Sequence, residues 1–119
     1  MSDAVRRGDV VVVRLDPTEG REVRKTRPAV VLSNDAACRF DAVVQVVPIS
    51  GMPGRELRPY EAILDSEGCG LRKPSRALAN QIRTVARHRL VERLGAVTGT
   101  ELEAVERAVL IQLGVRKVP

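Results

Sequence analysis

The densest group of residues that could do chemistry lies between Gly20 and Asn34, a stretch that reads GREVRKTRPAVVLSN. It opens with a glycine, gathers several cations beside one carboxylate and then enters an apolar run. Guanidinium and ammonium groups match phosphate in charge and in donor geometry, so this loop favours a polyanionic ligand over a neutral one. The alternative is a solvated hairpin tip. The charged residues are Arg21, Glu22, Arg24, Lys25 and Arg27.

If the anion is RNA, cleavage needs a base near the 2′-hydroxyl, an acid near the leaving 5′-oxygen and cations around the phosphorane. None of these groups has to be a metal. Glu22 can accept a proton, and Arg27 can stabilise a charged phosphorane through paired N–H donors. Ser50 ends a predicted strand, where its hydroxyl could hydrogen-bond a phosphate oxygen. Because a guanidinium stays protonated at ordinary pH, we expect Arg27 to act electrostatically.

Other reactive side chains are few. A histidine pair is excluded, because His88 is the only histidine, and its place between two predicted strands indicates a surface turn. Cys38 and Cys69 lie far apart with no neighbouring histidine or second cysteine, so neither a zinc site nor a disulfide framework is indicated. We expect buried thiols, and no metal or other cofactor.

Composition narrows the class of protein. The 119 residues suffice for one domain, residues 1–119, and are too few for two. With 44% hydrophobic and 29% charged residues the chain is not disordered, and its net charge of +5 favours a nucleic acid or another anionic partner. The start of the chain shows no signal peptide, and no apolar stretch reaches membrane-spanning length. We therefore expect a cytoplasmic protein with no membrane partner.

The elements that must position these groups are mainly short strands. Valine-rich runs bounded by Gly, Pro, Asp or Asn favour strand over helix, and their lack of alternation places them at the centre of a tightly curled sheet. A loop rich in Gly, Pro and Ser is expected over residues 65–75. Six strands are predicted: Asp9–Leu15, Pro28–Ser33, Ala42–Ser50, Tyr60–Asp65, Ala77–Val85 and Arg93–Thr98.

One helix is well marked near the C-terminal end. Thr100 as N-cap and Glu103 three residues later match a capping box, and Gly114 stands where a C-cap belongs. A shorter helical turn is predicted after Asn34, whose side chain can cap it. Together these elements predict a mainly β domain, a small closed barrel with the C-terminal α-helix packed against it. The apolar residues at helical spacing are Leu102, Val105, Val109 and Leu113.

Three motifs follow one another along nearly the whole chain: RRGDVVVVRLDP at 6–17, GREVRKTRPAVVLSND at 20–35 and NQIRTVARHRL at 80–90. In this order they resemble the MazF/PemK family of toxin endoribonucleases. Gly70, Leu71 and Ser75 also fall where that family has its G-[LF]-x-x-x-S stretch. The resemblance implies a small SH3-like curled barrel, the fold shared by MazF, PemK and CcdB, usually as a homodimer.

The resemblance also implies an activity. Family members cut single-stranded RNA, commonly mRNA, at short motifs without a metal and leave a 2′,3′-cyclic phosphate and a 5′-hydroxyl. Arg27 matches the catalytic arginine, because it immediately precedes the strand-opening Pro28. Ser50 falls where many members carry a catalytic threonine, and Glu22 matches an acidic position whose role varies. A cognate MazE-like antitoxin is implied as partner, with an acidic, disordered segment along the basic groove.

The segment NQIRTV supplies further expected contacts. Gln81, Arg83 and Thr84 match the family's Q-x-R-T motif, although Arg83 and Thr84 could instead hold the barrel together. The residues expected to contact RNA outside the catalytic set are Arg21, Arg24, Lys25, Pro28, Arg55, Arg58, Gln81, Arg83 and Thr84.

Two loops, at residues 17–26 and 50–59, are expected to set the RNA sequence that is recognised. Only Phe40 and Tyr60 are aromatic, so hydrogen bonding and arginine stacking would replace aromatic stacking on the bases. In the second loop, Arg55 and Arg58 extend the basic groove or are solvated charges.

Two other functions could use the same barrel. A gyrase poison of the CcdB type binds protein and does not catalyse, and the combination of Arg27, Glu22 and Ser50 argues against it. A barrel that binds nucleic acid or its antitoxin without cleaving RNA is left open by Ser50 in place of threonine.

Overall fold

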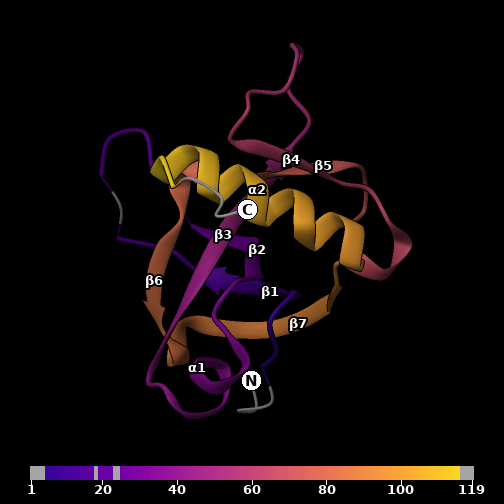
Figure 1. Cartoon of the computed structure of the whole chain (residues 1–119). Coiled ribbons are helices and arrows are strands. Elements are labelled where there is room, and N and C mark those ends of the chain that lie inside the picture. Colours follow the sequence, from indigo (N-terminus) through magenta and orange to yellow (C-terminus); the bar gives the residue numbers. More distant parts are fainter. Residues whose placement is uncertain (1–4, 18, 23–24, 116–119) are drawn as a thin grey trace.

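The computed structural model describes residues 5–17, 19–22 and 25–115 (Figure 1). In this part of the chain strands dominate and one long helix comes last, so the predicted mainly β class with a C-terminal helix is confirmed. In chain order the elements are β1 (Asp9–Arg14), β2 (Thr26–Val31), α1 (Asp35–Phe40), β3 (Val43–Gly51), β4 (Glu61–Leu64), η1 (Glu67–Cys69), β5 (Ser75–Leu78), η2 (Ala79–Gln81), β6 (Arg83–Ala86), η3 (Arg87–Arg89), β7 (Leu90–Ala96) and α2 (Gly99–Leu113).

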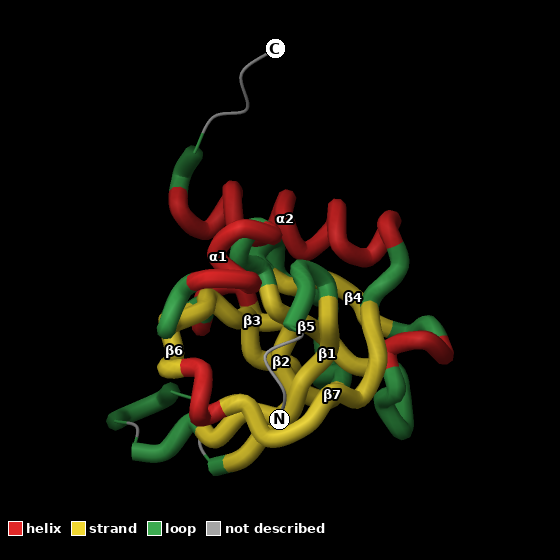
Figure 2. The backbone as a smooth tube through the Cα atoms, turned by 90° about the horizontal axis from the view of Figure 1, so that it is seen from below, coloured by secondary structure: helices red, strands yellow, loops and turns green. Residues whose placement is uncertain are grey.

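One antiparallel sheet runs through the molecule in the order β4-β5-β3-β2-β1-β7, with β6 paired to β3. Strand β3 is the pivot: it is nine residues long and pairs with β2, β6 and β5 in different parts of its length. The sheet curls around this strand, and α2 lies across it (Figure 2). Within the described residues β4 and β7 do not pair with each other. The curled barrel is confirmed, and its predicted closure is wrong.

The predicted strand over residues 77–85 is in fact two strands. Ala77 pairs with Ile49 and Arg83 pairs with Val46, so six steps along this segment correspond to three steps along β3. The surplus residues form the 3-10 turn η2 between β5 and β6. A single predicted strand therefore conceals a short 3-10 turn between two strands that both run antiparallel to β3.

Both faces of the central strands are buried, which explains their unbroken valine runs. Alternate residues of β1 and β2 enter two separate cores, of which one also contains α2. Cys69 and Cys38 lie one in each core as free thiols, as predicted, and burial raises their pKa values. His88 is exposed in η3, as predicted. No helix in the described residues is long and apolar enough to span a membrane.

Helix α2 begins earlier than predicted. Thr98, and not Thr100, is the N-cap: its Oγ1 accepts the Glu101 N–H at 3.1 Å, and Glu101 Oε1 accepts the Thr98 N–H at 2.9 Å. Both Thr-x-x-Glu pairs fit the capping-box pattern in the sequence. The predicted caps at Gly114, in the left-handed conformation, and at Asn34, which accepts the Ala37 N–H, are confirmed.

Glu101 is the better cap because its carboxylate also binds the loop after β4. It accepts the N–H groups of Asp65 and Ser66 at 3.0 and 3.1 Å and the Ser66 hydroxyl at 2.6 Å. Burial alone would raise the pKa of Glu101, but the Ser66 hydroxyl and the three N–H donors outweigh it and lower the pKa to about 2. One ionised side chain thus joins α2 to this loop.

Two glycines let β7 pass directly against η1. A Cβ atom on Gly95 would overlap the carbonyl oxygen of Gly68, and one on Gly70, whose φ is +72°, would overlap the Leu94 carbonyl. Only glycine fits such close backbone approach. The contact holds the segment 65–74 against the barrel.

Removing the charge of Glu101 should reduce the acid sensitivity of the fold. The folded-state pKa of about 2 lies below the ordinary 4.5, so the stabilisation is complete above pH 4.5 and is lost as the pH falls toward 2. Urea unfolding from roughly pH 6 to pH 2.5 should show a free energy of unfolding that falls less in Glu101→Gln than in the wild type, by at most about 3 kcal/mol. Glu103→Gln, on the exposed side of α2, is the control. Parallel wild-type and E101Q profiles would contradict this account.

Gly95→Ala should destabilise the barrel, because its new methyl group meets backbone that cannot move aside. We expect the free energy of unfolding to fall by about 2 kcal/mol or more in thermal or urea melts. Gly54→Ala is the matched control, since a Cβ at Gly54 meets no atom within 4 Å. Its effect should stay within about 0.5 kcal/mol, and equal losses in both variants would refute the close approach.

Candidate functional site

Arg27 and Ser50 come from neighbouring strands. In the β2–β3 ladder Ala29 pairs with Pro48, and Val31 pairs with Val46. Two further steps in the same register set Arg27 level with Ser50, and residues opposite each other in an antiparallel pair point to the same face. The sheet therefore brings together the two residues that the sequence placed more than twenty positions apart.

A surface cavity of about 410 Å³ joins these two side chains. Part of its lining is apolar and comes from Pro28, Ile49, Leu71 and Leu94. Besides Arg27, its cations come from the segment after η1, which Gly70 and Gly95 hold against the barrel. A hydroxyl and several cations around one hollow suit a phosphate group.

Arg72 and Lys73 are the cavity cations that sequence reasoning missed. The ammonium of Lys73 lies over β3: a Cβ atom added to Gly51 would be 3.5 Å from Lys73 Nζ. The Lys73 carbonyl accepts the Ser75 hydroxyl at 3.0 Å, which holds this turn. The signal was present in GLRKPS, where Gly70, Leu71 and Ser75 were recognised but the two basic residues between them were not assigned.

Glu22 lies elsewhere, since it is not among the described residues that line this cavity. Its side chain is 51% exposed, with Oε2 at 4.0 Å from Arg83 Nη1 and Oε1 accepting the Glu19 N–H at 3.2 Å. Nearby, Gln81 Nε2 donates to the Arg21 carbonyl at 3.3 Å. The first loop thus rests on the η2–β6 segment, and the predicted base is not brought to Ser50.

The other residues of the Q-x-R-T motif are bound within the protein. Arg83 Nη1 donates to the Leu15 carbonyl at 3.2 Å, at the base of the first loop. Thr84 is exposed and its hydroxyl accepts Gln45 Nε2 at 3.1 Å. These contacts agree with the alternative that Arg83 and Thr84 hold the barrel together.

The remaining predicted cations of the first loop are at the surface. Arg21 and Lys25 are exposed, and Lys25 adopts the left-handed conformation with φ of 64°. The Lys25 carbonyl accepts the Leu15 N–H at 2.9 Å, which closes the loop at its base. Arg24 lies outside the described residues.

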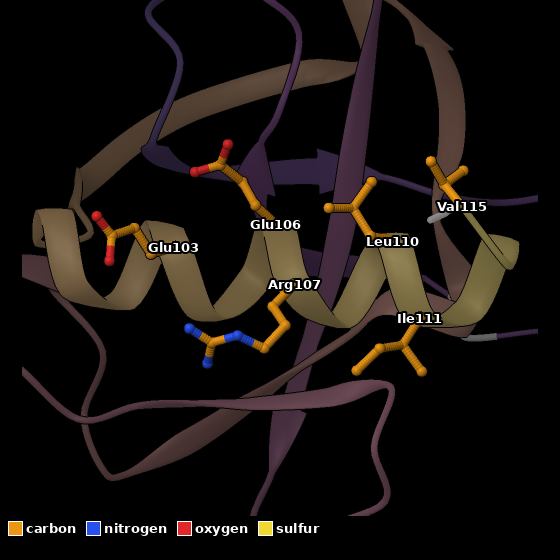
Figure 3. A pocket seen from close by; sticks show the side chains of 6 residues that line it. All are labelled: Glu103, Glu106, Arg107, Leu110, Ile111 and Val115. Atoms are coloured by element: carbon orange, nitrogen blue, oxygen red, sulfur yellow. The ribbon is translucent and has the colours of Figure 1, made fainter. Parts of the chain in front are cut away.

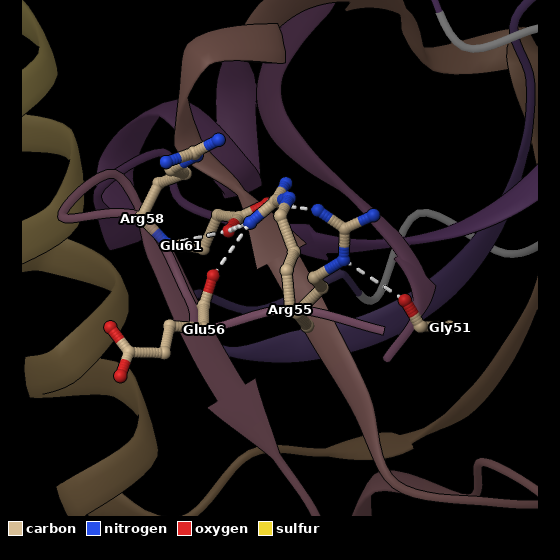
Figure 4. A network of polar contacts seen from close by, with 6 residues as sticks. Gly51, Arg55, Glu56, Arg58 and Glu61 are labelled. Carbon is tan, nitrogen blue, oxygen red and sulfur yellow. Dashed lines mark hydrogen bonds and ion pairs between the residues drawn. The ribbon is translucent and has the colours of Figure 1, made fainter. Parts of the chain in front are cut away.

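In the second loop the two predicted RNA contacts differ. Arg55 places Nη1 and Nη2 at 2.9 and 3.2 Å from the two oxygens of the buried Glu61, so it is paired within the protein (Figure 4). The Arg58 side chain is exposed and points away from Glu61 (Figure 4). Of the two, Arg58 is the better placed to extend a basic groove.

Across the described part of the chain, no three His, Cys, Asp or Glu side chains are grouped to hold a metal ion. The charged side chains that line the cavity are those of two arginines and one lysine. Guanidinium groups provide paired donors to phosphate, and the Ser50 hydroxyl provides one more.

Comparisons with known proteins identify a matching family and a relative of this chain. The family described as "PemK-like, MazF-like toxin of type II toxin-antitoxin system" matches residues 6–113. A relative, Endoribonuclease MazF9 of Mycobacterium tuberculosis, is 36% identical over 114 residues, which cover 92% of this chain and 96% of that protein.

Solved structures share the fold. MazF from Deinococcus radiodurans superimposes with a TM-score of 0.79 at 26% identity, covering 92% of this chain and 96% of that one. An endoribonuclease from a mycobacterial species, in complex with its cognate antitoxin, gives a TM-score of 0.79 at 23% identity over 97% of this chain and 100% of the other. Motifs, fold and relatives together show that this chain belongs to the PemK-like, MazF-like toxins of type II toxin–antitoxin systems.

Proposed function

We propose that this chain is a toxin that acts as a sequence-specific endoribonuclease on single-stranded RNA, mRNA in particular. Its family and its relative MazF9 support the activity. The observation that carries the proposal is the single cavity that holds Arg27, Ser50, Arg72 and Lys73. We place the reaction in the cytoplasm, where mRNA is translated.

In the proposed reaction the 2′-oxygen of a ribose attacks the adjacent phosphorus and the 5′-oxygen leaves. The leaving 5′-oxygen takes a proton from solvent, so the products are a 2′,3′-cyclic phosphate and a 5′-hydroxyl. Negative charge builds on the non-bridging oxygens of the phosphorane, where Arg27 donates paired N–H groups and Ser50 donates its hydroxyl. This stabilisation uses only side chains of the protein.

The 2′-hydroxyl must also lose its proton to a base as it attacks. Glu22 is the acidic residue of the first loop, but its carboxylate lies beside Arg83 in the described structure. As base, it would require this loop to carry it to the cavity when RNA binds. Where it lies, Glu22 supports the loop that presents Arg21 and Lys25.

Phosphates on either side of the cut would meet the other surface cations. Arg72 and Lys73 flank the cavity, and Arg21, Lys25 and Arg58 are exposed on the two neighbouring loops. Tyr60 packs against the core and is only partly exposed, so it offers little surface for base stacking. We therefore assign base recognition chiefly to hydrogen bonds and arginine stacking.

A cognate MazE-like antitoxin would silence this activity. Solved relatives include an endoribonuclease and a MazF, each in complex with its antitoxin. An acidic, disordered antitoxin segment would be drawn to the same cations that bind RNA, because both ligands are polyanions. Inhibition by occupation of the RNA groove follows from this shared charge.

We further propose a homodimer whose interface uses barrel strands and α2. A hollow of about 540 Å³ lies along the outer side of α2 (Figure 3). The end of the helix is apolar at the surface: Ile111, Leu113 and Val115 are 51%, 59% and 54% exposed. Such a patch is typical of a protein–protein contact, and sedimentation of a monomer at micromolar concentration would count against a dimer.

Replacing Arg27 by alanine should remove cleavage without unfolding the protein, since Arg27 is partly exposed at the start of β2. We expect the rate on labelled RNA in EDTA to fall about a hundredfold or more, because charge stabilisation at the phosphorane is lost. Arg39→Ala, an exposed arginine of α1, should cut at the wild-type rate.

Wild-type rates for R27A would overturn the arginine assignment. No RNA cleavage by the wild type, with inhibition of gyrase instead, would favour the CcdB-like alternative. Tight RNA binding by the wild type without products would favour the non-catalytic barrel.

Lys73→Gln should weaken RNA binding more than it slows the chemical step. A lost phosphate contact should raise KM by roughly three- to tenfold and reduce the slope of log Kd against log salt concentration by about 0.7. Arg39→Gln removes an exposed cation of α1 and should change neither quantity. A Lys73 variant with the wild-type salt slope would place the RNA away from this loop.

A further inference from the structure

A buried carboxylate, Glu61, organises the loop that follows Ser50 and Gly51. Its side chain is only 1% exposed, although it carries a charge. Besides both nitrogens of Arg55, it accepts the backbone N–H of Arg58 at 2.7 Å and Nη1 of Arg76 (Figure 4). The middle and the end of the loop between β3 and β4 are thus held by one side chain.

Arg76 links Glu61 to the strand that holds Ser50. In the β3–β5 ladder it pairs directly with Ser50, so the two side chains share one face of the sheet. Its Nε donates to the Gly51 carbonyl at 2.9 Å while its Nη1 binds Glu61. A single guanidinium therefore bridges the buried carboxylate and the residue that follows Ser50.

The resulting row of side chains crosses three strands. Arg27 on β2, Ser50 on β3 and Arg76 on β5 occupy successive positions. The register of β2 and β3 sets Arg27 level with Ser50, and both residues line the cavity. Ser50 and Arg76 are paired in the β3–β5 ladder. The Glu61 carboxylate offsets the charge of Arg76 and fixes its direction. Without it, a mobile guanidinium beside Ser50 would compete with Arg27 for the phosphate.

We infer that Glu61 is a positioning residue of this site: through Arg76 it fixes the backbone at Ser50 and Gly51, and through Arg55 it shapes the loop that selects the RNA sequence to be cut. The inference rests on the proposed endoribonuclease activity. It assigns to Glu61 no contact with RNA, because the side chain is buried behind its arginines.

The Glu61→Gln variant tests this role with little change in shape. The Arg55 pair, followed by the Arg58 N–H and Arg76, lowers the pKa of Glu61 to about 2 against the opposing effect of burial, so the wild-type residue is ionised at neutral pH. Glutamine has one acceptor oxygen and turns an NH₂ group toward the arginines. At least one guanidinium then loses its partner while the side-chain volume is kept.

The readout is the relative rate of cutting at different sites in one long in vitro transcript, measured at early times by sequencing the 5′-hydroxyl ends. Ratios between sites do not depend on how much of the enzyme is folded, so loss of stability alone leaves them unchanged. For E61Q we expect the ratio of preferred to secondary sites to change by about tenfold or more.

Two further variants make the test specific. Glu92→Gln removes the same charge from an exposed side chain of β7, outside both recognition loops and the cavity, and should reproduce the wild-type ratios. Arg76→Lys keeps the charge but lacks the fork that reaches both Gly51 and Glu61, so it should shift the ratios as E61Q does. If circular dichroism shows that E61Q is unfolded, R76K carries the test.

Wild-type site ratios in folded E61Q and R76K would overturn the inference and leave the endoribonuclease activity standing. A wild-type protein that produces no 5′-hydroxyl ends would instead refute the proposed function. The two failures are therefore told apart within one experiment.

Discussion

The arrangement of this protein depends on how β3 forms its backbone hydrogen bonds. The strand pairs with β2 and β6 along its first part and with β5 at its end, so it must pass from one half of the curled sheet to the other. The β2–β3 ladder stops at Ala29, next to Pro28, which has no N–H to donate. The cavity opens where these strands separate, and Arg27 and Ser50 stand on its two sides. The site is thus a consequence of a change of pairing partner.

Two buried carboxylates attach loops to this frame from different directions. Glu61 holds the loop before β4, and Glu101 holds the loop that follows it and leads to Arg72 and Lys73. Several arginines are likewise structural, because they donate to backbone carbonyls: Arg83 to Leu15, Arg87 to Cys38 and Arg89 to Arg14. Of the 20 lysines and arginines, these three therefore have fewer N–H donors left for an anionic ligand.

Features that depend on local sequence pattern were predicted. Features that depend on contacts between side chains far apart in the sequence were missed. Valine runs, the Asn34 cap and the Gly114 C-cap gave the fold class, and the motif RPAVV with the end of β3 gave Arg27 and Ser50. The start of α2 was wrong because two Thr-x-x-Glu pairs overlap, and only the contact of Glu101 with Ser66 selects between them. Arg72 and Lys73 were not assigned although GLRKPS contains them, because the place of Lys73 over Gly51 depends on the close contact that Gly70 and Gly95 make between this segment and β7. The pairing of Arg55 with Glu61 was invisible for the same reason.

Because residue 50 is a serine and not a threonine, the position of its hydroxyl depends more on the backbone around it. A threonine in a strand has a restricted χ1, because its methyl group packs against neighbouring atoms, whereas a serine hydroxyl can turn more freely. The position of the Ser50 hydroxyl then depends on how firmly the peptide after it is held, and in this chain the Gly51 carbonyl is bound by Arg76. Arg76 in turn is fixed by Glu61, whose side chain is buried. A serine hydroxyl, which lacks the restraint of a threonine methyl group, thus relies on a restraint that begins at a carboxylate two strands away.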